Sequence, residues 1–252
     1  MTQKSSDDEP PAQPTLRASG PDGQLARHDF TPERVAAFAQ LAQQFGDAQF
    51  LSEEAREESR AKIMAQHVPG QDLWVFGYGS LMWNPAIHVD ESLPAHVEGF
   101  QRSFCMRLIF GRAMPDNPGL MLCLVPGGSC AGIAHRIAPE HVESESKILW
   151  MREMLSGAYV PTWVDMDLGA RHVRGVTFVI NAAHPRYRPD IDIEEKVNLI
   201  ANAEGYLGSN RDYLFRTVAA LANAGIRDSY LDDIHTRVQA LVEAKSKQGA
   251  DT

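Results

Sequence analysis

Short apolar segments fill the chain from Leu73 to Asn181, and amphipathic helical patterns follow after Asp190. Segments such as LMLCLV and GVTFVIN have the length and the β-branched content of strands. A single helical pattern, PEHVESESKILWMREMLSG at residues 139–157, interrupts them. A run of strands followed by a run of helices favours an α+β domain with a mainly antiparallel sheet or a small barrel, and it disfavours alternating βαβ units.

The remaining strands are expected at short apolar segments that are bounded by turns. They are LWVF (73–76), SLMW (80–83), HVEGFQRSFCM (96–106), CAGIAHRI (130–137) and PTWVDMDL (161–168). The glycine- and proline-rich sequences PDNPG (115–119) and PGGS (126–129) predict turns between them. Helices are predicted at IEEKVNLIANAEG, NRDYLFRTVAALANAG and SYLDDIHTRVQALVEAKSK.

The N-terminal part of the chain differs in composition from the rest. Residues 1–29 are rich in Pro, Ser, Gly, Asp and Gln and are predicted to form a disordered tail. Residues 30–70 are predicted to form a helical extension, with Thr31 as the N-cap of its first helix and Ser52 at the start of a second, charged helix. The first helix has an apolar stripe of Val35, Phe38, Leu41, Ala42 and Phe45. Residues 71–245 are predicted to be the main domain.

Composition restricts the class of partner. The formal charge of −9 disfavours nucleic acid or an anionic membrane, so a small-molecule substrate is expected. Neither a signal peptide nor an apolar run of about 18 residues is recognisable, and the chain is expected to be cytoplasmic. The cysteines at 105, 123 and 130 show no disulfide or zinc spacing, and the histidines form no metal motif, so no metal site is predicted. The sequence does not indicate an oligomeric state.

Two glycines interrupt the strand-like sequence WVFGYGSLMW at residues 74–83. Glycine packs poorly inside a strand and often marks a close approach to the backbone. The sequence lacks the third glycine of a dinucleotide-binding loop and the spacing of a phosphate loop or a nucleophile elbow. A glycine bulge in a barrel strand is one interpretation. The other is a concave surface of N–H groups that binds a carboxylate or carbonyl oxygen.

Glu153 is predicted to lie on the apolar face of the helix at 139–157, in its last turn. Burial and the helix dipole both disfavour a charged carboxylate there, which is typical of a general base. The alternative is a salt bridge to an arginine from elsewhere in the fold. The neighbouring Arg152 is not expected to be the partner, because it points to the other flank of the helix.

Five sequence blocks, in order, resemble the ChaC-like γ-glutamylcyclotransferases between Trp74 and about Leu241. The blocks are WVFGYGSLMW, GFQRSFCM, NPGLMLCLVPGGSCAGIAHRI, LWMREMLSGAYVPTWV and IANAEGYLGSNRDYLF. The resemblance implies a small mixed β-barrel flanked by helices. It also implies a lyase that cyclises a γ-glutamyl group to 5-oxoproline, with glutathione as the characteristic substrate and no metal or organic cofactor.

The resemblance also implies site residues. Glu153 matches the catalytic glutamate, and Tyr213 matches a tyrosine near the pocket, with Tyr159 as a weaker candidate. The loop that holds the γ-glutamyl group matches Val75, Phe76, Gly77, Tyr78, Gly79, Ser80 and Leu81. The segment FGRAMPDNPG lacks the Arg-Gly-Thr-Pro of many members, so Arg112 receives no role. Cyclisation of other γ-glutamyl amines, or a binding module without activity, remain as alternatives.

Overall fold

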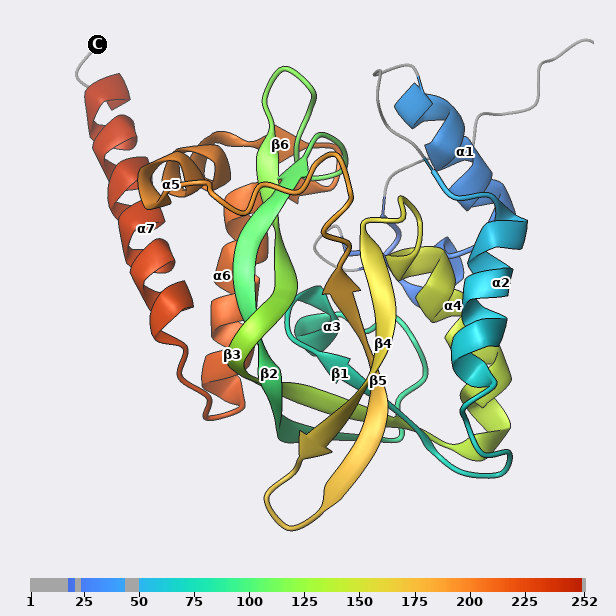
Figure 1. Cartoon of the computed structure of the whole chain (residues 1–252). Coiled ribbons are helices and arrows are strands. Elements are labelled where there is room, and N and C mark those ends of the chain that lie inside the picture. The colour runs from blue at the N-terminus through green and yellow to red at the C-terminus, as the bar shows by residue number, and fades with distance from the viewer. Residues whose placement is uncertain (1–17, 21–23, 44–49, 251–252) are drawn as a thin grey trace, which may run out of the picture.

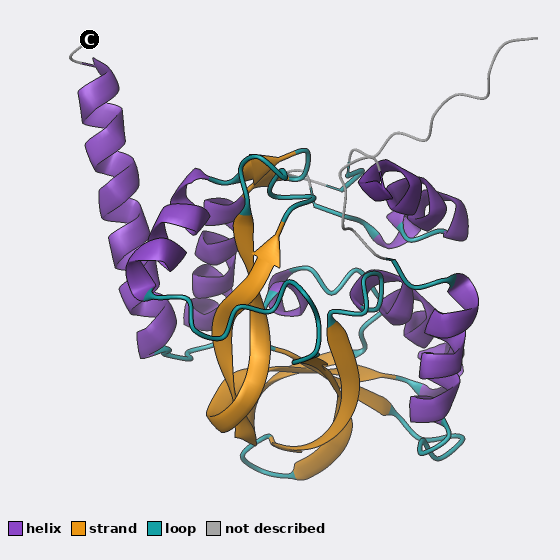
Figure 2. Ribbon diagram, turned by 45° about the horizontal axis from the view of Figure 1, so that its top comes forward, coloured by secondary structure: helices purple, strands orange, loops and turns teal. Residues whose placement is uncertain are grey.

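In the computed structural model, which describes residues 18–20, 24–43 and 50–250, a closed five-stranded β-barrel forms the centre of the molecule (Figures 1 and 2). Its strands are β1 (Leu73–Gly77), β2 (Glu91–Leu108), β3 (Gly119–Ile137), β4 (Tyr159–Asp167) and β5 (His172–Ile180). The order is β1–β3–β2–β4–β5, and β5 closes the barrel against β1 and β3. The β5 strand runs parallel to these two strands, and the other pairs are antiparallel. The predicted mixed barrel of an α+β fold is therefore confirmed.

Helices cover two flanks of the barrel. They are α1 (Pro32–Gln43), α2 (Glu53–Met64), α3 (Ser80–Trp83), α4 (Val142–Glu153), α5 (Ile193–Asn202), α6 (Asn210–Asn223) and α7 (Ser229–Ala250). Figure 1 shows α5, α6 and α7 on one side and α2 and α4 on the other. Short elements complete the chain: the 3-10 helices η2 (Arg27–Asp29) and η3 (Pro139–His141), and the paired strands β6 (Glu204–Gly205) and β7 (Gly208–Ser209). None of the helices in the described part of the chain has the length and apolar character needed to span a membrane.

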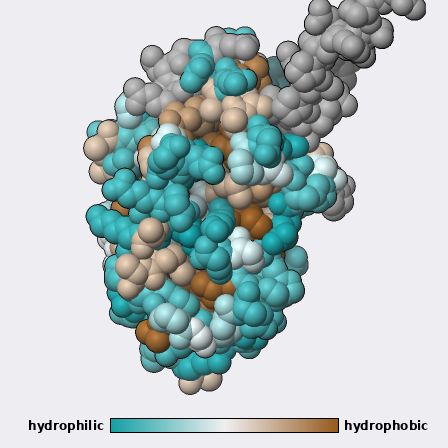
Figure 3. All heavy atoms as spheres, turned by 90° about the vertical axis from the view of Figure 1, so that its right-hand side faces the viewer, coloured by the Kyte–Doolittle hydropathy of each residue, from teal (hydrophilic) through white to brown (hydrophobic). Residues whose placement is uncertain are grey.

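Each flank has its own hydrophobic core. Phe76, Phe104 and Leu122 of the barrel pack with Leu214 of α6 and Leu231 of α7 in one buried cluster. A second cluster joins the barrel to α4, with further contacts from α2. The described outer face on this second side is mainly hydrophilic (Figure 3), as expected for the charged sequence of α2. Burial of both apolar faces fixes the helices on the barrel.

Two predictions about the strands were wrong. The segment Ser80–Trp83 is the short helix α3 and not a strand, because the chain turns out of the barrel after β1, with the Met82 N–H bonding to the Gly79 carbonyl at 2.9 Å. The sequence PGGS does not end a strand, because β3 continues through it. Gly127 and Gly128 adopt φ values of 106° and 65°, and β2 has a register shift opposite them, between Glu98 and Phe100. Glycine allows this bend within the long β2–β3 hairpin.

The helical predictions agree closely with the structure. The pattern at 139–157 forms η3 and α4, which ends at Glu153 rather than at Gly157. In the extension, the Ser52 hydroxyl accepts a hydrogen bond from the Ala55 N–H at 3.2 Å and caps α2. Phe45 and residues 1–17 lie outside the described residues, and the division of the chain at residues 29 and 70 stays a prediction.

A half-buried ion pair attaches the chain just before the extension to α4. Arg27 donates two hydrogen bonds to Glu145, at 3.1 and 2.6 Å, and the Glu145 side chain is only 1% exposed. The same carboxylate accepts the His88 N–H at 2.8 Å. Burial opposes ionisation of Glu145, but the hydrogen bonds from Arg27, His88 and Ser144 outweigh it and lower the pKa of Glu145 to about 2.

This pair predicts a defined acid sensitivity. Because the pKa of Glu145 falls from 4.5 to about 2 on folding, its contribution to stability is complete above pH 4.5 and is lost as the pH falls toward 2. We expect Arg27→Ala to lower the free energy of unfolding at pH 7 by about 1 kcal/mol, the modest value expected when one partner is half exposed, and to reduce the dependence on acid. Urea titrations from pH 2 to pH 7 measure both effects. Arg237→Ala, which removes two exposed ion pairs of α7, to Asp233 and to Glu194, is the control. Identical pH profiles for wild type and Arg27→Ala would contradict the assignment.

Candidate active site

A pocket of about 290 Å³ opens at one end of the barrel. At this end β1, β2 and β5 finish and β3 and β4 begin, so the loops from all five strands converge. The volume lies at the lower end of the range for small-molecule sites, about 300 to 1,000 Å³. The site is therefore built from the rim of the barrel.

Only part of the predicted substrate loop, Val75 to Leu81, reaches the pocket. Tyr78, Gly79, Ser80 and Leu81 line the pocket. Val75, Phe76 and Gly77 lie in β1, and they are not among the described residues that line the pocket. The side chains of Val75 and Phe76 are fully buried and hold the strand in the barrel. β1 thus positions the loop, and the loop faces the pocket.

Gly79 has no room for a side chain. A Cβ atom on this residue would lie 2.5 Å from the Tyr213 hydroxyl oxygen. Tyr213 is only 3% exposed and stacks edge-on against Trp83 and Phe104, so its ring has little freedom to move away. The glycine therefore allows the loop to approach the helix α6 that carries Tyr213.

Buried hydrogen bonds hold both α6 and the loop in place where they meet. The Asn210 side chain, at the start of α6, exchanges two hydrogen bonds with the backbone of Leu120, at 2.8 and 2.9 Å. The buried His135 ring lies 2.9 Å from the Leu81 carbonyl and 2.8 Å from the Ser92 hydroxyl. Burial lowers the pKa of His135 to about 4, so the ring is neutral at pH 7 and donates to the Leu81 carbonyl. His135 therefore supports the loop from the barrel.

Arg152 joins the loop to Glu153. Its Nε donates to a Glu153 carboxylate oxygen at 2.7 Å, and its Nη2 donates to the Ser80 hydroxyl at 2.9 Å. Its Nη1 donates to the Asn84 carbonyl and to the Pro85 carbonyl. Both charged side chains are largely buried, with 10% and 15% exposed. The expectation that Arg152 could not pair with Glu153 was wrong, because the helix ends at Glu153 and the long arginine side chain reaches across its end.

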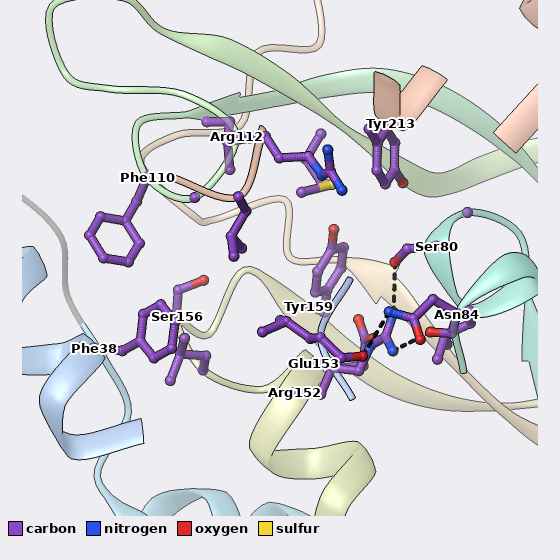
Figure 4. Close-up of a pocket in the computed structure, with 18 of the residues that line it drawn as sticks. Phe38, Ser80, Asn84, Phe110, Arg112, Arg152, Glu153, Ser156, Tyr159 and Tyr213 are labelled. Carbon is purple, nitrogen blue, oxygen red and sulfur yellow. Dashed lines mark hydrogen bonds and ion pairs between the residues drawn. The ribbon is translucent and has the colours of Figure 1, made fainter. Parts of the chain in front are cut away.

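Tyr159, Tyr213 and Arg112 also line the pocket. In Figure 4 the Tyr213 hydroxyl points toward Ser80, and the Tyr159 ring lies between Glu153 and Arg112 with its hydroxyl directed away from Glu153. The Tyr159 hydroxyl donates to the Leu122 carbonyl at 3.4 Å. Burial raises the pKa of both hydroxyls above the usual value, so they remain protonated donors at pH 7. Arg112 also lines the pocket, and its Nη1 donates to the Ser209 carbonyl at 3.1 Å. Burial lowers the pKa of Arg112, which forms no ion pair with any residue in the described ranges.

Sequence patterns missed several residues that the structure brings to the pocket. Arg152 and Arg112 carry no motif that identifies them, and Phe38 and Arg34 belong to the N-terminal extension. The three cysteines are buried free thiols, as expected. One group with metal-ligand character, His88, Asp90 and His141, lies near the start of α4, is mostly exposed and is not part of the pocket lining.

Fold and site together define a class of protein: a small mixed β-barrel with a glycine loop, a buried Arg–Glu pair and tyrosine hydroxyls at one rim. The chain belongs to the ChaC-like protein family, whose model matches residues 73–241. The chain is 40% identical over 199 residues to a glutathione-specific γ-glutamylcyclotransferase of Escherichia coli. The aligned residues cover 79% of this chain and 86% of the Escherichia coli protein.

Other relatives agree with this assignment. The γ-glutamylcyclotransferase 2-3 of Arabidopsis thaliana is 30% identical over 193 residues, which cover 71% of this chain and 94% of that one. The crystal structure of a yeast γ-glutamyl cyclotransferase specific to glutathione matches with a TM-score of 0.63 and 23% identity. It covers 68% of this chain and 96% of the yeast chain, and it supports the fold.

The close contact at Gly79 predicts a specific rescue. Gly79→Ala places a methyl group against the Tyr213 hydroxyl and is expected to destabilise the protein by about 1 to 3 kcal/mol, the cost of overpacking. Without the hydroxyl the nearest ring atom lies 3.7 Å away, an ordinary contact. Gly79→Ala is therefore expected to cost little in a Tyr213→Phe background. Urea unfolding of the four variants measures this, and an equal cost in both backgrounds would show that the hydroxyl is not the obstacle.

Proposed function

We propose that this protein is a γ-glutamylcyclotransferase that degrades glutathione to 5-oxoproline and Cys-Gly. The observation that carries the proposal is the Glu153 carboxylate, held in the pocket by the same guanidinium that binds the loop hydroxyl of Ser80. The γ-glutamylcyclotransferases of Escherichia coli and Arabidopsis thaliana, at 40% and 30% identity, support the reaction, and the glutathione specificity of the first supports the substrate. A small-molecule substrate fits a pocket of about 290 Å³.

The proposed reaction begins with the γ-glutamyl group on the loop at the end of β1. Glu153 removes a proton from the α-ammonium group, and the freed amine attacks the γ-carbonyl carbon of the same residue. This forms the C–N bond of a five-membered ring. Holding the chain folded favours the attack, because the amine and the carbonyl then meet at high effective concentration.

The tetrahedral intermediate carries a negative oxygen. Backbone N–H groups of the loop and the Ser80 hydroxyl are proposed to stabilise it. Arg152 donates to the Ser80 oxygen, which leaves the Ser80 proton able to point toward the ligand. Protonated Glu153 then delivers its proton to the departing cysteinyl nitrogen as the C–N bond to it breaks. The ring nitrogen, which still carries two hydrogens after the attack, loses one of them as a proton, and this proton is taken up by the released Cys-Gly amine. The products are 5-oxoproline and Cys-Gly, and the glutamate is a carboxylate again.

The assigned roles extend to the remaining predicted residues. Tyr213 is proposed to donate a hydrogen bond to the γ-glutamyl group, and Tyr78 to support the loop through its 2.7 Å bond to the Phe178 carbonyl. No metal or organic cofactor enters these steps. We also propose that the protein acts in the cytoplasm, whose reducing conditions suit its three buried thiols and keep glutathione abundant.

Purified protein incubated with glutathione provides the direct test, with mass spectrometry of the products. We expect equimolar 5-oxoproline and Cys-Gly. Turnover of a γ-glutamyl amine with a different leaving group, but not of glutathione, would favour a related cyclotransferase. Absence of 5-oxoproline from every γ-glutamyl compound would contradict the proposal and favour a binding module.

Glu153→Gln keeps the size and the hydrogen-bonding capacity of the side chain but removes its basicity. We expect kcat to fall by roughly 100-fold or more, with the fold intact by circular dichroism. Glu140→Gln is the matched control, because Glu140 is exposed in η3 and lies outside the pocket. Near-normal turnover by folded Glu153→Gln would remove the glutamate from the mechanism.

A further inference from the structure

Part of the pocket wall comes from a segment that precedes the family match. The ChaC-like match begins at residue 73, whereas seven pocket-lining residues come from the segment 24–38. They are Gln24, Leu25, Asp29, Phe30, Arg34, Val35 and Phe38. Phe50, after the next described gap, also lines it. The extension therefore contributes to the site itself.

Specific contacts fix this segment over the pocket. Arg27 pairs with the buried Glu145, and the Leu25 carbonyl accepts the Asn84 side-chain N–H at 3.0 Å. Asn84 also presents its carbonyl to Arg152, so the segment is attached to the residues around the proposed base. Farther along, the Leu51 N–H bonds to the Leu155 carbonyl at 2.9 Å, directly after α4. The chain before α1 and the chain before α2 are thus each attached to residues around α4.

Two aromatic side chains of the extension cover different parts of the pocket. The Arg152 guanidinium lies 5.9 Å from the centre of the Phe30 ring, a distance at which a cation interacts with the ring face. Phe38 packs at 5.7 Å from Phe110 and 5.8 Å from Tyr206, and these two rings lie 4.9 Å apart. The three rings come from α1, from the loop after β2 and from the turn between β6 and β7.

The aromatic cluster of Phe38, Phe110 and Tyr206 lies at a distance from the proposed chemistry. Figure 4 shows Phe38 and Phe110 on one side of the pocket and Ser80, Glu153 and Tyr213 on the other, with Arg112 between the two sides. A γ-glutamyl group at the Ser80 and Glu153 end leaves the cluster side of the pocket for the rest of its substrate. The cluster is aromatic, with the Arg34 guanidinium 5.6 Å from the centre of the Phe38 ring, and aromatic rings suit contact with a peptide backbone and a thiol side chain.

Resting on the proposed function, we propose that the extension forms the wall of a distal subsite that binds the leaving portion of the substrate, and that Phe38 is a specificity-determining residue in this wall. The γ-glutamyl group is recognised at the barrel rim by residues of the matched segment. The dipeptide beyond the scissile bond is recognised by α1. Loss of Phe38 therefore weakens binding of glutathione without weakening binding of a γ-glutamyl compound that has a very small leaving group.

The test measures binding apart from turnover. Dissociation constants for glutathione and for γ-glutamyl methylamide are determined by calorimetry in the Glu153→Gln background, with and without Phe38→Ala. We expect Phe38→Ala to weaken glutathione binding about tenfold, the usual scale for an aromatic contact in a pocket, and to leave methylamide binding unchanged. Phe38→Leu is expected to restore much of the affinity. Gln40→Ala, on the exposed face of α1, is the matched control.

Steady-state kinetics in the otherwise wild-type protein give the second measurement. Phe38→Ala is expected to raise KM for glutathione with a small effect on kcat. If the protein turns over glutathione but Phe38→Ala changes neither the affinity for glutathione nor KM, the proposed distal wall is wrong. The proposed function would then stand. Binding that depends on Phe38 without any 5-oxoproline from wild type would overturn the function and leave the wall intact. Equal weakening of both ligands would also contradict the wall, because it would indicate a general structural effect.

Discussion

The candidate site depends on one guanidinium. Arg152 binds the Glu153 carboxylate, the Ser80 hydroxyl and the carbonyls of Asn84 and Pro85, so it joins α4 to the chain that leaves β1. With only 10% of its side chain exposed, it cannot exchange these partners for water at low cost. Charge-assisted hydrogen bonds of this kind are short and directional. They fix the distance between the proposed base and the loop that would hold its substrate.

The barrel makes this arrangement possible. Antiparallel pairing of β1 with β3 places Gly77 opposite Ile133, so the loop begins at a fixed point on the rim. The neutral His135 on β3 then holds the Leu81 carbonyl, and Trp83 donates to the Thr217 hydroxyl of α6 at 3.1 Å. The loop is thus held from the barrel, from α4 and from α6. A site that must orient an amine against a carbonyl within one small molecule gains from this rigidity.

The sequence predicted those features that follow from local patterns. Apolar periodicity identified the barrel strands and the later helices. Glu153 was selected as the candidate base because a charge on an apolar face has a clear cost, and that role stays a prediction. The pairing of Arg152 was missed, because helical-wheel positions do not describe a side chain at the helix end. The bend at Gly127 and Gly128 resembled a turn, since both features require the same backbone freedom. The extension's part in the pocket depends on contacts between residues more than a hundred positions apart, such as Arg27 with Glu145, which no local pattern contains.

A double-mutant cycle on Arg152 and Glu153 tests the central claim that the arginine acts by holding the glutamate and the loop together. The kcat for glutathione is measured for wild type, Arg152→Gln, Glu153→Gln and the double variant. If Arg152 serves the base, each single change lowers kcat strongly, and the double variant is about as slow as Glu153→Gln alone. Losses that multiply independently in the double variant would contradict the account, because they would show that the two residues do not act as a unit.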